Sequence, residues 1–253
     1  MHNNHSIDRD SQPPRVPDGV RVYAIGDVHG RDDLLWTLLG RIRDDLQAAP
    51  IGRCQVVFLG DYIDRGPDSR HVIERLLDGP GEWCGNVAAD WICLRGNHEE
   101  QAMRFLHDSN AGFGWLHNGG METLRSYIGG VCHDMDDDLT ALQLLFERSL
   151  PPTHLRFLAR LPLWYVVGDY FFVHAGIRPG VELHQQSPHD LLWIRRDFFN
   201  EEAWHGKFIV HGHTIHETPD EHWNRAGIDT GAYYTHHLTC LVLEGEKRRF
   251  LAT

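Results

Sequence analysis

From Val20 onward the chain repeats one pattern of apolar and polar positions. A short apolar run leads into a turn rich in Gly and Asp, and a segment with apolar residues at helical spacing follows. The apolar runs are 20–25, 54–59 and 90–94, and the stripe after the first spans 31–46. Strands that alternate with helices predict a parallel sheet with right-handed crossovers.

Two later regions have different patterns. Residues 109–160 show helical spacing around 139–148 and 153–160, which predicts a mostly helical insert over the face that carries the active site. The stretch 163–174 reads as a hairpin around a two-residue turn. Further strands are expected at 207–210, 225–228, 239–245 and 247–252. We therefore expect an α/β fold in which two mixed sheets pack face to face with helices outside.

The first eighteen residues contrast with this pattern. They are polar, contain Pro and have no apolar core, so they predict a flexible tail rather than a secretory signal. Residues 19–253 are then expected to form a single catalytic domain. No apolar run in the chain approaches the length of a membrane span, so no membrane association is expected.

Charge and cysteine use narrow the possible functions. The formal net charge is −12, which is unfavourable for binding nucleic acid, because the phosphate backbone needs a basic surface. The five cysteines are scattered without a C-x-x-C pair, which argues against a disulfide framework and predicts a cytoplasmic protein. Nineteen histidines suggest a metal site without establishing one.

Side chains of types that commonly bind metal ions (Asp, Asn and His) directly follow five of the apolar runs. They are Asp27 and His29 in GDVHG, Asp61 in GDYIDRG, Asn97 and His98 in RGNHE, His174 in VHAG, and His211 and His213 in HGHT. Taken singly, such an Asp is more often a turn residue, and a lone His is more often structural. Their joint occurrence after successive strands predicts that they converge, because ligands bind at the carboxyl ends of strands in open α/β sheets.

The series GDVHG, GDYIDRG, RGNHE, HAG and HGHT closely resembles the motifs of the calcineurin-like metallophosphoesterases. Within that group it resembles the phosphoprotein phosphatase (PPP) family, in its bacterial and bacteriophage branch. The motifs run from residue 26 to about 231. The resemblance implies a four-layer αββα sandwich with a two-metal centre.

The resemblance also implies the metal ligands. One ion would be held by Asp27, His29 and Asp61, and the second by Asp61, Asn97, His174 and His213. These donor types suit two divalent ions, with Mn preferred and Fe, Zn or Co as alternatives. A hydroxide that bridges the two ions would attack phosphorus in line.

The same resemblance suggests roles for residues around the metals. His98 would be the general acid, with Asp64 orienting it. Arg65, Arg95, Arg195 and the ligand Asn97 would bind the substrate phosphate, although each arginine could instead form a structural ion pair.

Several positions remain open. In VHGHT the family pattern selects His213, so His211 is expected behind the site or at its wall, and Asp229 is given a supporting role. Trp115 in WLHNGG resembles a segment near the substrate cleft, but it could equally be a packing residue. The acidic run 134–138 is expected to be a solvated helix start rather than a calcium loop.

We therefore expect a metal-dependent phosphomonoesterase that acts as a serine/threonine protein phosphatase on phosphoproteins or other phosphoesters. The alternative is a dinucleoside polyphosphate hydrolase, such as a diadenosine tetraphosphatase. The pair Asp64 and Arg65 favours the monoesterase, because tetraphosphatases tend to lack the acidic residue there. Phosphotyrosine hydrolysis stays open, and a silent binding scaffold is disfavoured because every ligand position is filled.

Overall fold

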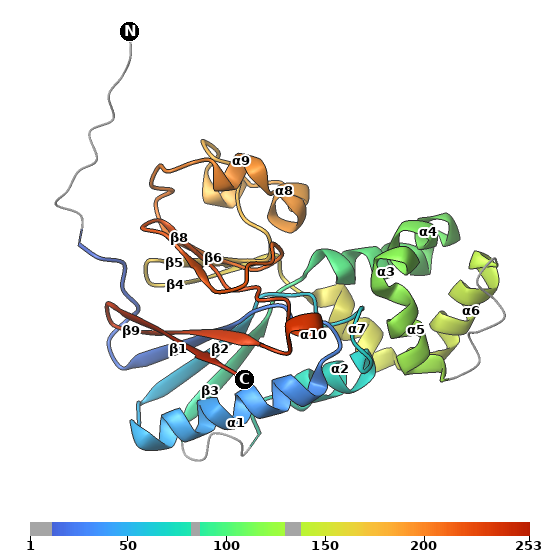
Figure 1. The fold of residues 1–253 in the computed structure, drawn as a ribbon, viewed down its shortest axis with the longest axis horizontal. Helices are drawn as coiled ribbons and strands as arrows, with labels where there is room; N and C mark the ends of the chain where they lie inside the picture. The colour runs from blue at the N-terminus through green and yellow to red at the C-terminus, as the bar shows by residue number, and fades with distance from the viewer. Residues whose placement is uncertain (1–11, 82–86, 130–137) are drawn as a thin grey trace, which may run out of the picture.

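Two mixed β-sheets packed face to face form the centre of the molecule in a computed structural model that describes residues 12–81, 87–129 and 138–253 (Figure 1). The first sheet contains, in spatial order, β10 (Lys247–Ala252), β9 (Thr239–Glu244), β1 (Val20–Ile25), β2 (Arg53–Phe58) and β3 (Ala88–Cys93). The second contains β4 (Trp164–Val167), β5 (Tyr170–Val173), β6 (Phe208–His211), β8 (Arg225–Gly227) and β7 (Asp220–Glu221).

Each sheet has a parallel centre. In the first sheet β1, β2 and β3 run parallel, and β9 and β10 are antiparallel additions. In the second sheet β5, β6 and β8 run parallel, and β4 and β7 are antiparallel. The expected α/β sandwich is therefore present, and the parallel centres bring the ends of successive strands to one edge.

The alternation of side chains along β1 explains why it is covered on both faces. Val22 and Ala24 belong to the cluster between the two sheets, whereas Tyr23 and Ile25 face the helices outside the first sheet. Successive side chains of a strand point to opposite faces of the sheet. When both faces are apolar, other elements must pack on each of them. Strand β5 repeats this arrangement, with Phe172 between the sheets and Phe171 on the outer face.

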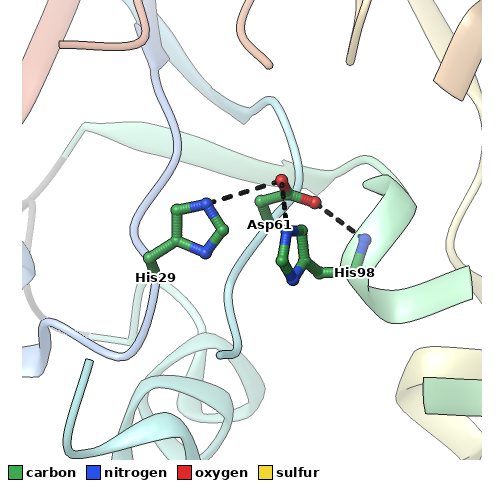
Figure 2. A group of neighbouring side chains, drawn as sticks. All are labelled: His29, Asp61 and His98. Atoms are coloured by element: carbon green, nitrogen blue, oxygen red, sulfur yellow. Dashed lines mark hydrogen bonds and ion pairs between the residues drawn. The ribbon is translucent and has the colours of Figure 1, made fainter. Parts of the chain in front are cut away.

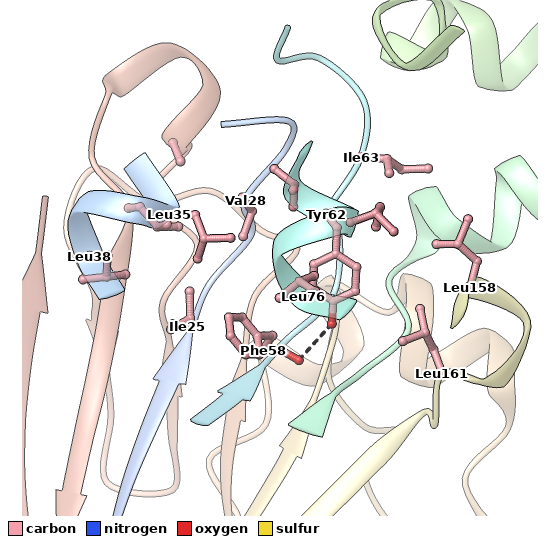
Figure 3. Close-up of a cluster of buried hydrophobic side chains, with 14 of the residues drawn as sticks. Ile25, Val28, Leu35, Leu38, Phe58, Tyr62, Ile63, Leu76, Leu158 and Leu161 are labelled. Carbon is pink, nitrogen blue, oxygen red and sulfur yellow. Dashed lines mark hydrogen bonds between the residues drawn. The ribbon is translucent and has the colours of Figure 1, made fainter. Parts of the chain in front are cut away.

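Helices form the two outer layers. On the first sheet lie α1 (Asp32–Ala48), α2 (Ser69–Asp78) and α7 (Pro152–Arg160), and on the second α8 (Pro188–Trp193) and α9 (Arg196–Phe199) (Figure 1). Figure 3 shows Leu35 and Leu38 of α1 above Ile25 of β1. The leucine stripe predicted over 31–46 is therefore the buried face of α1.

The segment after β3 is helical and lies beside the two sheets, at the right of Figure 1. It comprises α3 (Asn97–His107), α4 (Gly112–Trp115), a wide π-type turn (Leu116–Gly120), α5 (Met121–Ile128) and α6 (Leu139–Ser149). A short α10 (Ala232–Thr235) precedes β9. Of the acidic run, Asp138 caps α6 through a bond from the N–H of Ala141, and residues 134–137 lie outside the described part.

The predicted flexible tail needs a correction at its end. Residues 1–11 lie outside the described part of the chain, but Val16 is fully buried in the cluster between the sheets. Its N–H donates to the carbonyl of Gly245, and the N–H of Arg15 donates to the Asp169 carboxylate. Val16 therefore anchors the end of the predicted tail to the domain. The polar composition of the surrounding residues gave no indication of this.

Strand bounds differ from the expected ones by one or two residues. The strand expected at 207–210 is Phe208–His211, and the two-residue β7 was not foreseen. In the described part of the chain, no helix is both long and apolar enough to cross a membrane.

Candidate metal centre and phosphate pocket

The predicted ligands lie just after the carboxyl ends of parallel strands. Because the central strands of each sheet are parallel and the two sheets face each other, these ends meet at one edge. The strands concerned end at Ile25 (β1), Phe58 (β2), Cys93 (β3), Val173 (β5) and His211 (β6). Ligands that are far apart in the chain are thereby brought together.

Asp61 is the centre of this group. Its Oδ2 lies 3.6 Å from Nε2 of His29, 3.8 Å from Nε2 of His98 and 3.5 Å from Nε2 of His174. Its Oδ1 accepts a hydrogen bond from the backbone N–H of His98 at 3.0 Å (Figure 2). Burial alone raises the pKa of Asp61, but the neighbouring histidines outweigh that effect and hold it well below its usual value.

Two of these histidines are oriented by backbone carbonyls. Nδ1 of His29 bonds to the carbonyl of Ile63, and Nδ1 of His174 bonds to that of Leu59, each at 2.9 Å. Each bond places the proton on Nδ1 and leaves the lone pair of Nε2 facing Asp61. Metal-binding histidines typically use their second nitrogen in this way.

Metal-type side chains converge at two points in the described part of the chain. One group is His29, Asp61 and His98, and the other is Asp61, His174 and His213. Asn97 adjoins the second group, because its Oδ1 lies 2.9 Å from Nε2 of His174. The two groups share Asp61, as a carboxylate that bridges two ions would require.

Asp27 bonds to the backbone of a residue in the second group. Its carboxylate accepts the backbone N–H of His213 at 3.1 Å and adjoins Asp229, and it is in neither group of converging ligands. Burial, followed by the charges of Asp229 and Asp61, raises the pKa of Asp27 well above its usual value. The role of Asp27 as a ligand of the first ion stays a prediction.

The donor set nevertheless fits divalent cations. Nε2 of His213 is buried without a hydrogen-bond partner, and burial followed by the effect of His174 lowers its pKa to about 2. Three buried carboxylates (Asp27, Asp61 and Asp229) lie close enough to influence one another's pKa. Neutral imidazoles and clustered carboxylates are the ligands that Mn, Fe or Zn prefer.

His98 and Asp64 form a buried pair beside this group. Nδ1 of His98 lies 2.5 Å from Oδ2 of Asp64. Burial alone lowers the pKa of His98, but the Asp61 charge and the bond to Asp64 raise it above its usual value. The other hydrogen bonds to the Asp64 carboxylate come from the helical segment: Trp115 Nε1 donates to Oδ2 at 2.7 Å and Thr123 Oγ1 to Oδ1 at 2.6 Å. Trp115 therefore has a polar role as well as a packing one.

Backbone strain is concentrated at the same place. Six non-glycine residues among those described have a positive φ, and five of them are predicted site residues. The five are His29 (46°), Asp61 (52°), Asp64 (74°), Arg65 (67°) and His213 (63°). Such conformations cost about 1–3 kcal/mol each and persist only where the surroundings hold them.

Glu99 is a buried residue that the sequence analysis did not single out. Its carboxylate accepts the backbone N–H groups of Asp61 and Gly96, both at 2.9 Å, and that of Tyr62 at 2.8 Å. Glu99 thereby joins the turn after β2 to the turn after β3. Its position three residues after Gly96, as in a capping box, was the available signal.

A cavity of about 370 Å³ opens beside the ligands. Its lining includes Asp61, Asn97 and His98, together with Arg65 and Arg195, as predicted for a phosphate pocket. Residues that the sequence analysis did not single out also contribute, namely Asn118, Trp193, Thr214, Ile215 and Tyr233. Arg195 donates to Thr214 Oγ1 at 3.0 Å, and the Arg65 guanidinium lies over the Tyr233 ring.

Arg95 does not line this cavity, in contrast to the expected phosphate contact. Its guanidinium pairs with Glu100 at 3.2 Å and donates to the carbonyl of Ala159 at 3.0 Å. Neither Glu100 nor Ala159 lines the pocket, and Glu100 pairs with the charge of Arg95. The structural alternative that the sequence left open therefore describes the observed position of Arg95.

His211 is fully buried behind the site and packs against the rings of Phe198 and Phe199. Burial lowers its pKa to about 3, so it is neutral. Asp229, which adjoins Asp27, has its pKa raised to about 6 by burial.

The family model for calcineurin-like phosphoesterases matches residues 20–238, which is most of the chain. The chain belongs to the calcineurin-like phosphoesterase family. It is accordingly a phosphatase of the hydrolase class, and this family implies divalent metal ions.

Curated relatives of this calcineurin-like phosphoesterase carry two kinds of name. Serine/threonine-protein phosphatase 1 of Salmonella typhimurium is 29% identical over 225 residues, which cover 86% of this chain and 89% of the relative. Bis(5'-nucleosyl)-tetraphosphatase PrpE of Oceanobacillus iheyensis is 26% identical over 241 residues, which cover 87% of each chain.

Solved structures share the fold of this calcineurin-like phosphoesterase. A candidate diadenosine tetraphosphatase superposes with a TM-score of 0.61 at 18% identity, covering 95% of this chain and 98% of the other. A cold-active protein tyrosine phosphatase superposes with a TM-score of 0.55 at 16% identity, covering 94% and 81%. At these identities the likeness concerns the fold.

Proposed function

We propose that this protein is a metal-dependent phosphomonoesterase that acts as a serine/threonine protein phosphatase. The observation that carries the proposal is the buried pair of Asp64 and His98 at the edge of a pocket that also exposes Arg65. Such a pair suits an ester whose leaving alkoxide must be protonated.

We propose that two divalent ions, Mn or alternatively Fe, Zn or Co, would be held by Asp27, His29, Asp61, Asn97, His174 and His213. When bound, the ions supply Lewis-acid stabilisation of the phosphoryl oxygens and lower the pKa of the attacking water. The bonds from Nδ1 of His29 and His174 to backbone carbonyls leave Nε2 of each ring unprotonated for this role, and Nε2 of His29 accepts a hydrogen bond from Nη1 of Arg65 at 3.1 Å.

The chain's own residues then bind the phosphate and supply the proton. Arg65 and Arg195 face the pocket and attract the phosphate oxygens through charge-assisted hydrogen bonds. His98 holds a proton that Asp64 and Asp61 favour, and it delivers that proton from Nε2 to the leaving oxygen. Asp64 keeps the ring oriented through Nδ1.

Hydrolysis of a bis-nucleoside tetraphosphate is the second candidate. It is supported by the PrpE relatives, which match this chain over nearly their whole length. The pairing of Asp64 with His98 argues against it, since a general acid serves a poor leaving group, whereas a nucleotide is a good leaving group.

The acidic chain and free thiols at Cys93 and Cys240 support a cytoplasmic protein that acts on phosphoesters without binding nucleic acid or membranes.

The test compares kcat/KM of the purified, Mn²⁺-loaded protein on a phosphoserine/phosphothreonine peptide, a phosphotyrosine peptide and diadenosine tetraphosphate. The proposal expects the phosphoserine/phosphothreonine peptide to be the best substrate by at least about tenfold, a difference of 1.4 kcal/mol in transition-state binding. A preference for diadenosine tetraphosphate would overturn it in favour of the second candidate. A preference for phosphotyrosine would overturn the serine/threonine assignment alone.

A further inference from the structure

Asn118 lies between Arg65, the proposed phosphate-binding residue, and His98, the proposed general acid. Its Oδ1 is 3.1 Å from Nη2 of Arg65, and its Nδ2 is 3.3 Å from Nε2 of His98. A guanidinium donates hydrogen bonds and accepts none, so the Asn118 atom that faces Arg65 must be the oxygen. The orientation of the amide is therefore fixed, and its NH₂ group faces His98.

An unusual turn brings Asn118 to this place. The wide turn Leu116–Gly120 interrupts the helical path at Asn118 (φ −93°, ψ 17°) and Gly119 (φ 105°, ψ 4°). A Cβ on Gly119 would lie 2.6 Å from the side chain and 2.8 Å from the backbone nitrogen of Arg65, so only glycine fits there. Such turns within helices are frequent at functional sites.

The turn is also bonded directly to the phosphate-binding residue. The backbone N–H of Arg65 donates to the carbonyl of Gly119 at 3.0 Å. Arg65 and Asp64 both have a positive φ, and the helical segment contacts both of them. The position of Asn118 relative to Arg65 and His98 is thus fixed by backbone as well as side-chain contacts.

We propose that Asn118 binds the ester oxygen of the leaving group, beside His98. This inference rests on the proposed function, in which Nε2 of His98 protonates that oxygen. An oxygen within hydrogen-bond distance of Nε2 also comes within reach of Nδ2, because the two nitrogens are only 3.3 Å apart. Nδ2 carries two hydrogens. One is directed to Oε1 of Gln101 at 3.5 Å, and a protonated Nε2 of His98 cannot accept the other, which is therefore available for this oxygen.

The oxygen of a water molecule forms a new bond to phosphorus, and the protons of that water stay with the phosphate product. The bond between phosphorus and the ester oxygen breaks, and its electron pair stays on that oxygen. The proton on Nε2 of His98 moves to the oxygen, while Asn118 donates a hydrogen bond and transfers no proton. A fixed donor aimed at developing negative charge stabilises the transition state more than the ground state.

This role makes Asn118 selective for the leaving group. Serine and threonine phosphates release a strongly basic alkoxide, which accumulates much charge and gains most from the extra donor. The p-nitrophenolate ion is a weak base that spreads its charge into the ring, so it gains little. A merely structural role would affect both substrates alike.

The experiment measures kcat of Asn118→Ala and Asn118→Leu on a phosphoserine peptide and on p-nitrophenyl phosphate, with Mn²⁺ loading checked by elemental analysis. We expect a fall of about 10–100-fold on the peptide, which is at or below the usual cost of removing one such donor, and a change within about threefold on p-nitrophenyl phosphate. The Leu variant fills the space of Asn118, so agreement between the two variants excludes local collapse as the cause.

His117→Ala is the matched control, because this exposed neighbour lies in the same turn and its ring contacts Phe113, with Nδ1 bonded to the Phe113 carbonyl. It should leave both activities unchanged. Equal losses on the two substrates, or no loss, in the Asn118 variants would overturn the inference. His98→Ala, measured on the same two substrates, separates this inference from the proposed function. If only His98→Ala loses more activity on the peptide than on p-nitrophenyl phosphate, the role of Asn118 is refuted and that of His98 stands. If His98→Ala loses equally on both substrates, the role of His98 as general acid is refuted.

Discussion

The carboxylate of Glu99 accepts the backbone N–H of Asp61 at 2.9 Å. The residue that bridges the two ligand groups is thus held by a side chain from the neighbouring turn. Asp61 itself has a φ of 52°, which is unfavourable for any residue with a Cβ. The geometry of the candidate metal centre therefore depends on a carboxylate that is not a proposed ligand.

Replacing Glu99 by Gln tests this dependence. The Gln side chain has one acceptor oxygen, and its NH₂ group would face backbone donors, so buried N–H groups lose their partners. We expect the free energy of unfolding to fall by about 1–3 kcal/mol, and the melting temperature by several degrees. The measurement is thermal unfolding at pH 8, above the Glu99 pKa, which burial and then the Asp61 charge raise to about 7.

The adjacent Glu100 supplies the control for that variant. Its carboxylate pairs with Arg95 and Arg104 at the partly exposed face of α3. Because such surface pairs contribute about 1 kcal/mol or less, Glu100→Gln should change stability little. Equal destabilisation by the two variants would show that the bonds from Glu99 to the backbone are not what holds the turns.

His98→Ala or His98→Asn should lower kcat on a phosphoserine peptide by about two orders of magnitude or more, which is the usual scale of general acid catalysis. The proton donor is lost while Asp61, His174 and His213 remain as ligands. Steady-state kinetics and metal content by elemental analysis check the prediction together. Unchanged kcat with full metal content would rule out His98 as the acid, and lost metal would indicate that His98 is a ligand in the group with His29.

Asp61→Asn should abolish binding of one or both metal ions, because the shared carboxylate of both groups becomes a neutral amide. The binding of an ion to the native state alone raises its stability. We therefore expect Mn²⁺ to raise the melting temperature of the wild-type protein after chelation with EDTA, and to leave that of Asp61→Asn unchanged. A variant that retains two ions per chain by elemental analysis would contradict the bridging role of Asp61.

Replacing Arg195 and replacing Arg95 should have different effects on substrate binding. Arg195→Ala removes a cation that lines the pocket, and we expect KM on a phosphoester to rise by about tenfold or more, the value of a charge-assisted hydrogen bond. Arg95→Ala should change KM by less than about twofold, because its guanidinium is engaged by Glu100 and the Ala159 carbonyl. Initial rates across substrate concentration distinguish the two. A comparable rise in KM for Arg95→Ala would mean that this side chain turns into the pocket when substrate binds.

The sequence predicted the sandwich because its local patterns are strong. Strand β1 follows from a run in which five of the six residues are apolar, on both faces, and α1 follows from a leucine stripe at helical spacing. The types of the ligands could also be named in advance, because each follows a strand at a turn and together they form a recognisable series.

The sequence could not show where each side chain points. Asp27 and Arg95 stand in the expected motifs, yet Asp27 bonds to the backbone of His213 and Arg95 pairs with Glu100. These partners compete with the metal or the phosphate for the same polar atoms. Such a competition is decided by distances between turns, which no local pattern encodes.

The sequence by itself determined the sandwich and the kinds of ligand at its strand ends, because hydrophobic periodicity and turn chemistry are local properties. Only the tertiary structure placed Val16 between the sheets and brought Asn118 between Arg65 and His98. Both placements depend on contacts between segments far apart in the chain, where burial and hydrogen-bond geometry, rather than residue type, set the outcome.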